Sequence, residues 1–353
     1  MLGGAMLLRG GKDGTPSGPA PGANATDANA RQSPEVVLRI APGAPGPTRA
    51  AAPSKISPLM REANGGGSAK PIYDRLIASS SRTPEENYLL AEIIRMCGRR
   101  DMSKVVPAPA EPPMSLAEAR EKSKANFLAS ISEKDPTRDK RLKAFTQATQ
   151  NRCDGMEGVK FNEAELRELI EKGAAGGDPK ARARLIEKDI WAPLAGADGN
   201  MKMGPEFKMP RITDSQLEGL REAARSGDPS ALMIVGRVLS STMEDLTIRA
   251  GPHEQTVDAR AFFDAWTLLT CDAGFDCGPN NGQVLFACYA QGNCDAGDLR
   301  EAQFFYNNSP QQSQRVAEYQ SQLARAIQTG DWSYFQFVRA RPPTGMTSLF
   351  GMP

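Results

Sequence analysis

The chain has 353 residues, with 43 Lys and Arg against 42 Asp and Glu, and its formal net charge is +1. This balance gives no overall electrostatic attraction for nucleic acid, so we expect no nucleic-acid partner. Hydrophobic residues make up 40% of the chain and aromatic residues 6%, which is sparse for a β-sandwich, while the central segments are rich in helix-forming Ala, Leu, Glu, Arg and Gln and favour an all-α fold.

The first 69 residues are predicted to be a disordered tether. They are rich in Pro, Gly, Ala, Ser and Asn and cannot bury enough apolar surface to offset the entropy of ordering them. Within this tether, EVVLRIAPG at 35–43 either docks as a short strand on the body or on a partner, or stays loose. Residues 1–9 are mostly apolar and have two interpretations, a disordered start or the remnant of a signal anchor that would tether the protein to a membrane.

From residue 70 onward, a capping residue followed by Pro predicts the start of several helices. The side chain of the first residue accepts a hydrogen bond from the first turn, and Pro has no N–H to leave unpaired there. These pairs are Thr83-Pro84, Asp135-Pro136, Asp178-Pro179, Asp228-Pro229 and Ser309-Pro310. We therefore expect N-terminal helical hairpins at 70–155, a helical-repeat region at 156–338 and a flexible tail at 339–353. A Pro-rich connector at 105–113 and a Gly- and Met-containing loop at 191–211 separate the hairpins.

An internal repeat is visible around two of these helix starts. The segments LIEKGAAGGDPKARARLIE and LREAARSGDPSALMIVGRV align without a gap on Gly177-Asp178-Pro179 and Gly227-Asp228-Pro229. Ile170 then falls on Leu220, and Ala181 falls on Ala231. A looser third copy ends at Gly330-Asp331. A spacing of about fifty residues between such starts indicates stacked helix pairs.

The stretch REAARSGDPSALMIVGRVL at 221–239, followed by VDARAFFDAWTLL at 257–269, resembles the SEL-like repeats, which are relatives of the tetratricopeptide α-solenoids. In that family the pattern AA..G...A...LG closes one repeat and opens the next. The matching residues here are Ala223, Ala224, Gly227, Ala231 and Gly236. The Gly-rich hairpin loop of the family is replaced by SSTMEDLTIRAGPHEQT at 240–256. The resemblance implies stacked antiparallel helical hairpins in an α-solenoid-like arrangement.

The six cysteines are interpreted as three disulfides. Four of them, at 271, 277, 288 and 294, lie six, eleven and six positions apart, whereas zinc knuckles and redox motifs place their cysteines two to four residues apart. We expect Cys97 to pair with Cys153. Within the cysteine-rich hairpin 256–295 three pairings are open, and the one we favour joins Cys271 to Cys288 and Cys277 to Cys294, across two antiparallel helices.

An even number of cysteines with none left over indicates an oxidising compartment, and we expect the protein in the bacterial periplasm or secreted from the cell. The alternative is that all six are buried, reduced thiols in a cytosolic protein.

No catalytic, cofactor-binding or metal-ligating residue is predicted. His253 is the only histidine and lies in a Gly-Pro turn without an adjacent nucleophile, so Ser–His–Asp and Cys–His catalysis are not expected. The densest aromatic segments are interpreted mainly as core, with the alternative that some of their rings line a peptide groove. The residues assigned to this candidate binding surface are Phe262, Trp266, Tyr306 and Trp332.

These observations favour a non-catalytic helical-repeat protein that binds another protein or a peptide in the bacterial cell envelope. The alternative is an all-α envelope hydrolase that acts on cell-wall glycan through a Glu general acid. Such an enzyme would need a cleft that holds a partly buried Glu with a perturbed pKa. A secreted effector or toxin-related protein is a third interpretation that the sequence neither favours nor opposes.

Overall fold

The computed structural model describes residues 56–100, 116–150, 152–194, 209–241, 243, 245–303 and 308–339. The predictions for residues 1–55, the Pro-rich connector at 105–113 and the tail beyond Arg339 lie outside these ranges. Within them, no helix is long and apolar enough to cross a membrane.

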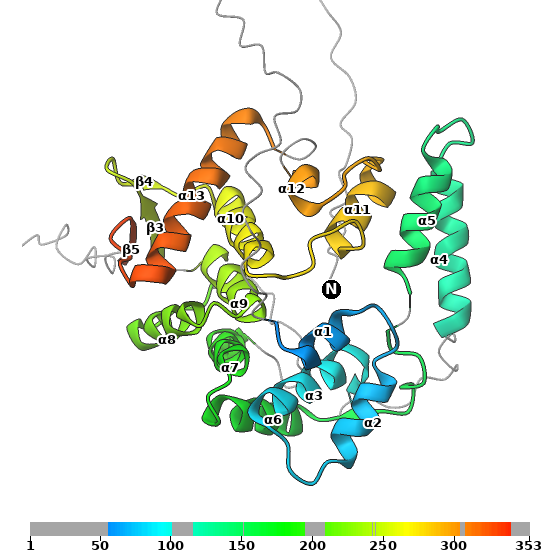
Figure 1. Ribbon diagram of the computed structural model, residues 1–353, viewed down its shortest axis with the longest axis horizontal. Helices are drawn as coiled ribbons and strands as arrows, with labels where there is room; N and C mark the ends of the chain where they lie inside the picture. The colour runs from blue at the N-terminus through cyan, green and yellow to red at the C-terminus, as the bar shows by residue number, and fades with distance from the viewer. Residues whose placement is uncertain are drawn as a thin grey trace, which may run out of the picture. The chain divides into compact units, whose positions relative to one another are not determined.

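Helices dominate the described residues (Figure 1), as the composition predicts. They are α1 (Pro58–Asn64), α2 (Lys70–Ala78), α3 (Pro84–Cys97), α4 (Leu116–Ser130), α5 (Arg138–Ala148), α6 (Glu163–Ala175), α7 (Pro179–Trp191), α8 (Asp214–Arg225), α9 (Pro229–Ser240), α10 (Ala259–Asp272), α11 (Gly282–Gln291), α12 (Leu299–Glu301) and α13 (Pro310–Thr329). A short 3₁₀ turn, Ala192–Leu194, continues α7.

The folded body begins earlier than the tether prediction places it. Ser57 and Pro58 repeat the pattern of a capping residue followed by Pro, and the Ser57 side chain accepts a hydrogen bond of 3.1 Å from Met60 N. Met60, Ala63 and Ala69 are buried in the main hydrophobic core. Residues 56–69 therefore belong to the packed body, because a short amphipathic helix can be stabilised by the core that it covers.

Most of the predicted helix starts are confirmed. Thr83 and Glu86 form the expected capping box, and Asp178, Asp228 and Ser309 accept hydrogen bonds from the first turns of α7, α9 and α13. Asp135 differs, since its carboxylate accepts from Thr137 in a turn and α5 begins two residues after Pro136.

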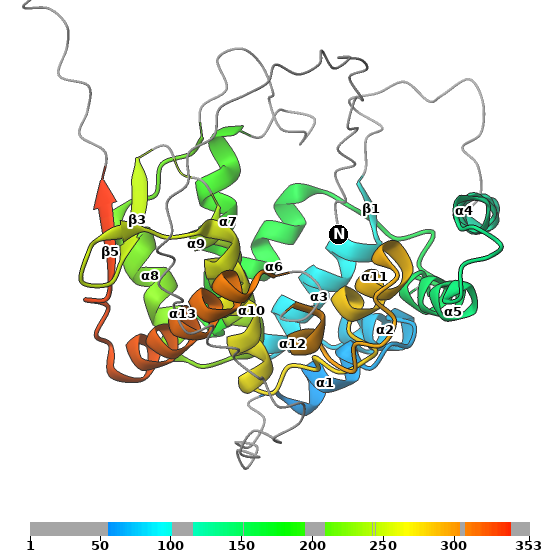
Figure 2. The same cartoon turned by 90° about the horizontal axis from the view of Figure 1, so that it is seen from above.

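Two small sheets correct the all-α prediction. The three-stranded sheet has the order β4 (Gln255–Thr256), β3 (Leu246–Ala250) and β5 (Phe335–Arg339), all antiparallel, and lies beside α13 (Figures 1 and 2). A two-residue parallel ladder joins β1 (Arg99–Arg100) to β2 (Lys160–Phe161). β3 pairs with β5, which lies far away in the chain. A local sequence pattern cannot predict such a pairing, because it depends on a long-range contact.

The third, looser copy of the repeat does not open a second helix. Gly330 ends α13 with a φ of +76°, and Asp331 accepts a hydrogen bond of 2.9 Å from Ser333 N in the turn that follows. The chain then enters β5, whose Phe335 packs against Phe262 of α10 and Tyr319 of α13. The Gly-Asp pair therefore serves as a turn here and as a helix cap in the other two copies.

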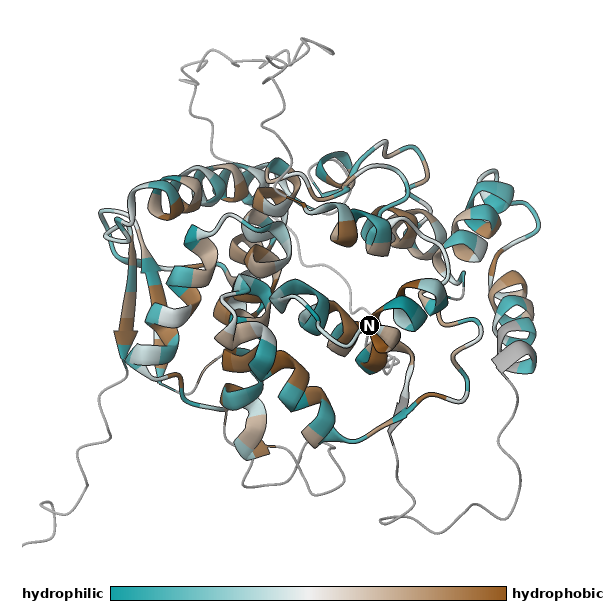
Figure 3. Ribbon diagram, turned by 60° about the horizontal axis from the view of Figure 1, so that its bottom comes forward, coloured by the Kyte–Doolittle hydropathy of each residue, from teal (hydrophilic) through white to brown (hydrophobic). Residues whose placement is uncertain are grey.

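The helices pack both on near neighbours in the chain and on helices far apart in it, as α11 does on α5. α3 packs on α6 and α7, α7 packs on α8 and α9, α9 packs on α10, and α10 packs on α13. Figure 3 shows both polar and apolar residues on most helices, and the buried apolar residues form one main cluster that extends from Met60 to Phe335. Most of these helices are thus amphipathic elements whose apolar faces are covered by their neighbours.

The disulfides are Cys97–Cys153, Cys271–Cys277 and Cys288–Cys294. The first is the predicted pair, whereas the predicted pairings of Cys271 with Cys288 and Cys277 with Cys294 are wrong. α10 and α11 are each followed by a glycine with positive φ, Gly274 at +99° and Gly292 at +81°. These turns bring each chain segment back to the end of its own helix, so each cysteine pair closes locally.

Candidate functional site

The interpretation of the densest aromatic segments as core is confirmed for Phe262, Trp266 and Trp332, and the alternative that these three rings form a binding surface is wrong. Phe262 and Trp266 are fully buried and Trp332 is 7% exposed, and all three belong to the main core. The rings of Phe262 and Trp266 meet edge to face, and those of Trp266 and Trp332 are stacked with centroids 6.4 Å apart. Tyr306 lies outside the described residues. These rings pack the α9–α10–α13 region, because large apolar side chains at helix crossings gain most from burial.

A buried lysine joins the N-terminal ends of three helices. Lys180 of α7 is 3% exposed, and its Nζ lies 2.9 Å from Asp178 Oδ2, 3.0 Å from Glu85 Oε1 and 3.3 Å from Asp228 Oδ2. Asp178 and Asp228 each use their other oxygen to cap a helix, α7 and α9 respectively. Burial would lower the pKa of Lys180, but the surrounding carboxylates outweigh burial and hold that pKa above its ordinary value.

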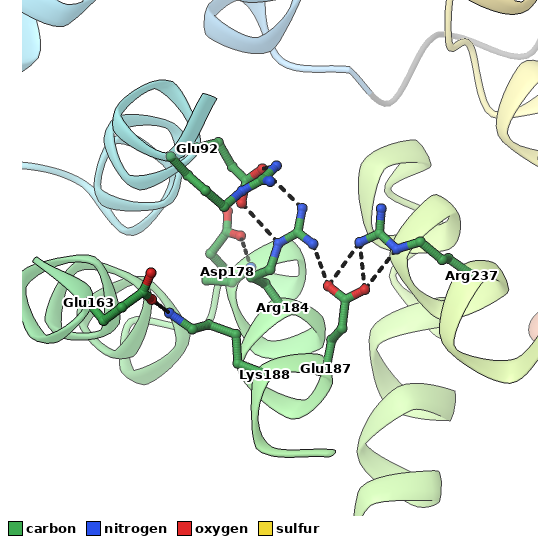
Figure 4. A network of polar contacts seen from close by, with 9 residues as sticks. Glu92, Glu163, Asp178, Arg184, Glu187, Lys188 and Arg237 are labelled. Carbon is green, nitrogen blue, oxygen red and sulfur yellow. Dashed lines mark hydrogen bonds and ion pairs between the residues drawn. The ribbon is translucent and has the colours of Figure 1, made fainter. Parts of the chain in front are cut away.

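A second polar network crosses the same three helices (Figure 4). Arg184 of α7 donates from Nε and Nη2 to the two carboxylate oxygens of Glu92 on α3, at 2.9 and 3.0 Å, and also pairs with Glu187. Arg237 reaches Glu187 from α9 with bonds of 2.7 and 2.8 Å. Arg95 binds the outer side of Glu92 at 2.7 Å. The network therefore links α3, α7 and α9 through paired charges.

The electrostatics of this network keep its carboxylate charged. Burial would raise the pKa of Glu92, but the guanidinium groups of Arg184 and Arg95 more than compensate, so the pKa lies below its ordinary value. Glu92 is therefore ionised at neutral pH and cannot supply a proton as a general acid. Tyr88 is buried beside it, and burial raises the pKa of its phenol.

A pocket of about 200 Å³ opens next to this network, between α1, α2 and α3. Its apolar lining is buried to more than 90% and comes from Met60, Ile72, Leu89 and Ile93. Glu92 is the one carboxylate among its described lining residues. The remaining lining includes Met96, which is 46% exposed, and two arginines, Arg95 and Arg152. The pocket thus combines an apolar interior with positive charge.

Arg152 enters this pocket from the loop before β2. Its backbone oxygen accepts a hydrogen bond of 2.7 Å from Ala69 N, and its Nη2 donates to Ala63 O. Its Nε is buried without a hydrogen-bond partner, and burial lowers the pKa of this guanidinium. Cys153, the next residue, is bonded to Cys97 at the end of α3. The disulfide therefore attaches the Arg152 loop to the helix that forms the opposite wall.

A second pocket, of about 430 Å³, is mostly polar and lies between the β3–β4 turn and α13. Glu254, Arg325 and Tyr334 are among its lining residues, and His253 is exposed in the adjacent turn, as expected for a surface loop residue. Asp264 of α10 lines neither pocket. Burial raises the pKa of Asp264, and its neighbours are Arg260 at 3.2 Å and Asn308 at 3.3 Å.

The sequence interpretation missed Lys180 and Arg184, because isolated Lys and Arg residues on amphipathic helices resemble solvated charges, and it missed Arg152, which lies in a loop without a motif around it. A signal was nevertheless present in the repeat. Glu187 and Arg237 lie fifty positions apart and so occupy the same place in the two aligned copies. Opposite charges at equivalent positions of stacked repeats lie close enough to pair.

Comparison of the chain with protein-family models, with curated proteins and with solved structures finds no match. The geometry of the described residues is therefore the basis for assigning a function.

Proposed function

We propose that this protein is a non-catalytic, SEL-like helical-repeat protein that binds a short peptide segment of another protein in the bacterial periplasm or outside the cell. The observation that carries the proposal is the pocket between α1, α2 and α3, with its apolar interior, its exposed Met96 and its guanidinium groups. A small pocket built on packed helices is suited to hold an anchor side chain of a partner.

Equivalent positions in successive helices support the repeat assignment. The helices α3, α7 and α9 begin after the caps Thr83, Asp178 and Asp228. Nine positions after its cap, each helix has a charged residue: Glu92, Glu187 and Arg237, respectively. These three positions belong to one continuous polar network through Arg184. Helices stacked in register place equivalent residues in a row, which is the arrangement expected of a solenoid.

The disulfides support the proposed location. All six cysteines are paired, and such bonds persist in oxidising environments, which means the periplasm or the exterior of a bacterial cell. A pocket held by a disulfide would keep its shape there without depending on a large domain.

The test is a selection from a random peptide display library on the immobilised, oxidised full-length chain. We expect enrichment of a shared motif that contains an apolar residue, and loss of binding when Met96→Asp places a charge at the pocket. Ile77→Asp is the matched control, because Ile77 is 51% exposed on α2 and does not line the pocket. The proposal fails if no motif is enriched, or if both variants lose binding equally.

A hydrolase that uses a Glu general acid receives no support at this pocket. The only carboxylate among its described lining residues is Glu92, whose pKa is lowered by its guanidinium partners. Incubation of the protein with purified peptidoglycan, followed by chromatography of the soluble fragments, tests this alternative directly. We expect no release of glycan fragments.

A further inference from the structure

We propose that the pocket between α1, α2 and α3 recognises the C-terminal end of a peptide, with Arg152 as the residue that binds the terminal carboxylate and the apolar lining as the site of the last side chain. This inference rests on the proposed function and specifies its ligand. It follows from the charges at the pocket, from its size and from the position of one disulfide.

One arginine at the pocket, Arg152, has no carboxylate partner among the described residues, whereas the pocket's carboxylate is already paired. Glu92 is already bound by Arg184 at 2.9 and 3.0 Å and by Arg95 at 2.7 Å. Arg152, in contrast, donates to a backbone oxygen, Ala63 O, and its Nε has no partner. A half-buried guanidinium without a carboxylate is an unfavourable arrangement that an anionic ligand relieves, since planar guanidinium and carboxylate groups bind in pairs of hydrogen bonds.

The size of the pocket favours a chain end. Its volume of about 200 Å³ is below the range of roughly 300–1,000 Å³ that is typical for cofactors and drug-sized ligands. It can accept one or two side chains, and Met60, Ile72 and Leu89 offer them an apolar environment. A peptide that ends in the pocket brings an apolar side chain and a carboxylate together, which matches the lining and Arg152 at once.

The Cys97–Cys153 disulfide positions these two parts of the site. Cys97 directly follows Met96 of the pocket wall, and Cys153 directly follows Arg152. The bond therefore links α3, which carries Leu89 and Ile93 of the apolar lining, to the loop that carries Arg152. Recognition of the carboxylate should depend on this disulfide.

The experiment measures fluorescence anisotropy of the oxidised full-length chain with fluorescein-labelled pentapeptides that end in Leu, Val or Phe, each as the free acid and as the C-terminal amide. We expect at least one free acid to bind about ten- to a hundred-fold more tightly than its amide, because the amide loses a charge-assisted interaction with Arg152. A peptide amide with an internal Glu tests a side-chain carboxylate, and we expect it to bind no better than the other amides.

Variants assign the effect to Arg152. Arg152→Gln should remove the preference for the free acid, and Arg152→Lys should restore part of it, since Lys keeps the charge without the planar group. Arg75→Gln is the control, because Arg75 is an exposed arginine of α2 that pairs with Glu62 and does not line the pocket. Circular dichroism melting curves verify that each variant is folded.

Cysteine variants test the role of the disulfide. The paired replacement Cys97→Ser with Cys153→Ser should weaken the preference for the free acid, whereas Cys271→Ser with Cys277→Ser should preserve it, since that bond closes the end of α10.

The outcomes separate this inference from the proposed function. If free acids and amides bind equally and Met96→Asp abolishes both, the pocket binds peptides but the carboxylate inference is wrong. If no peptide binds and display selection also finds none, the proposed function fails as well. Concentration-dependent self-association that Arg152→Gln removes would assign the pocket to a second copy of the chain and overturn the inference.

Discussion

At the scale of single residues, the body of this protein depends on buried charges that are fully partnered. Lys180 and Arg184 bring positive charge into the contacts of α3, α7 and α9, and carboxylates from all three helices meet them. A buried charge is costly without its partner, so removing one member should destabilise the fold more than removing a surface ion pair. The two networks therefore link the helices most strongly where their charges are least exposed.

Glu92→Gln should lower the free energy of unfolding at pH 7 by about 3 kcal/mol, because Arg184 stays buried without its charged partner. Glu92 has a pKa below its ordinary value of 4.5 in the folded state. The stabilisation that the Glu92 carboxylate provides is therefore complete above pH 4.5 and is lost as the pH falls through the folded pKa. Below pH 4.5 the free energy of unfolding should thus fall less steeply with pH in Glu92→Gln than in the wild type. Urea unfolding between pH 3 and 7 measures both effects.

Glu62→Gln, at an exposed pair with Arg75, is the control and should change the midpoint little. Equal losses in the two variants would contradict the assignment.

Lys180→Met should also destabilise the protein by roughly 3 kcal/mol, since Glu85, Asp178 and Asp228 would face one another without a cation. Lys172→Met removes an exposed lysine that pairs with Glu168 within α6 and should have little effect. Thermal unfolding of both variants at pH 7 makes the comparison. If Lys180→Met melts like the wild type, the three carboxylates do not depend on Lys180 for charge neutralisation and the prediction is wrong.

At the scale of elements, small residues set how closely the helices approach. Gly236 of α9 lies against Trp266 of α10, and a Cβ atom there would come within 2.4 Å of the Trp266 Cβ. Ala181 and Ala231, at equivalent positions of α7 and α9, are fully buried. The small residues of the repeat pattern therefore permit close crossings rather than mark a binding site.

Gly236→Ala should destabilise the protein by about 1–3 kcal/mol, because the added methyl group overlaps the start of a large, fully buried side chain. Gly219→Ala in α8 is the matched control. Its added Cβ would meet only the side chain of Ile186, most closely the terminal Cδ1 atom, which can move aside, and alanine favours the helix by about 1 kcal/mol. Chemical denaturation of both variants should show a loss for the first and no loss for the second; a loss in Gly219→Ala of the same size would refute the argument.

At the scale of the whole molecule, the three disulfides differ in how far apart in the chain their cysteines lie. Cys97–Cys153 joins residues 56 positions apart, whereas the other two bonds each span 6 positions at the end of one helix. The long bond restricts the unfolded chain most, and it also connects α3 to the loop that carries Arg152. The Cys97–Cys153 bond thus contributes both to the stability of the fold and to the shape of the candidate site.

Replacing Cys97 and Cys153 by Ser should cost about 4 kcal/mol, and replacing Cys271 and Cys277 about 2 kcal/mol, because the entropy of the unfolded chain increases more when a longer loop is released. Chymotryptic digestion of the denatured, unreduced protein checks the pairing itself. No linked peptides should join a cysteine before Phe286 to a cysteine after it; such a peptide would restore the pairing across the hairpin.

The local features of this protein could be predicted from its amino-acid sequence. The caps at Thr83, Asp178 and Asp228 and the amphipathic helices each depend on neighbours within a few residues, so pattern and propensity were sufficient to predict them. The pairing of Cys97 with Cys153 was predicted as well, although only Cys97 ends a helix and Cys153 lies in the loop after α5.

Contacts between residues far apart in the chain became visible with the fold. The fold decided between core and groove for Phe262, Trp266 and Trp332, which are buried, and it paired β3 with β5. It also brought Arg152 to the pocket beside Glu92. The direction of the chain after Gly274 and Gly292 decided the remaining disulfides, a choice that cysteine spacing alone left open. Burial and pairing of this kind depend on how helix faces are arranged in space, and the free energy of that arrangement is shared among many residues far apart in the chain.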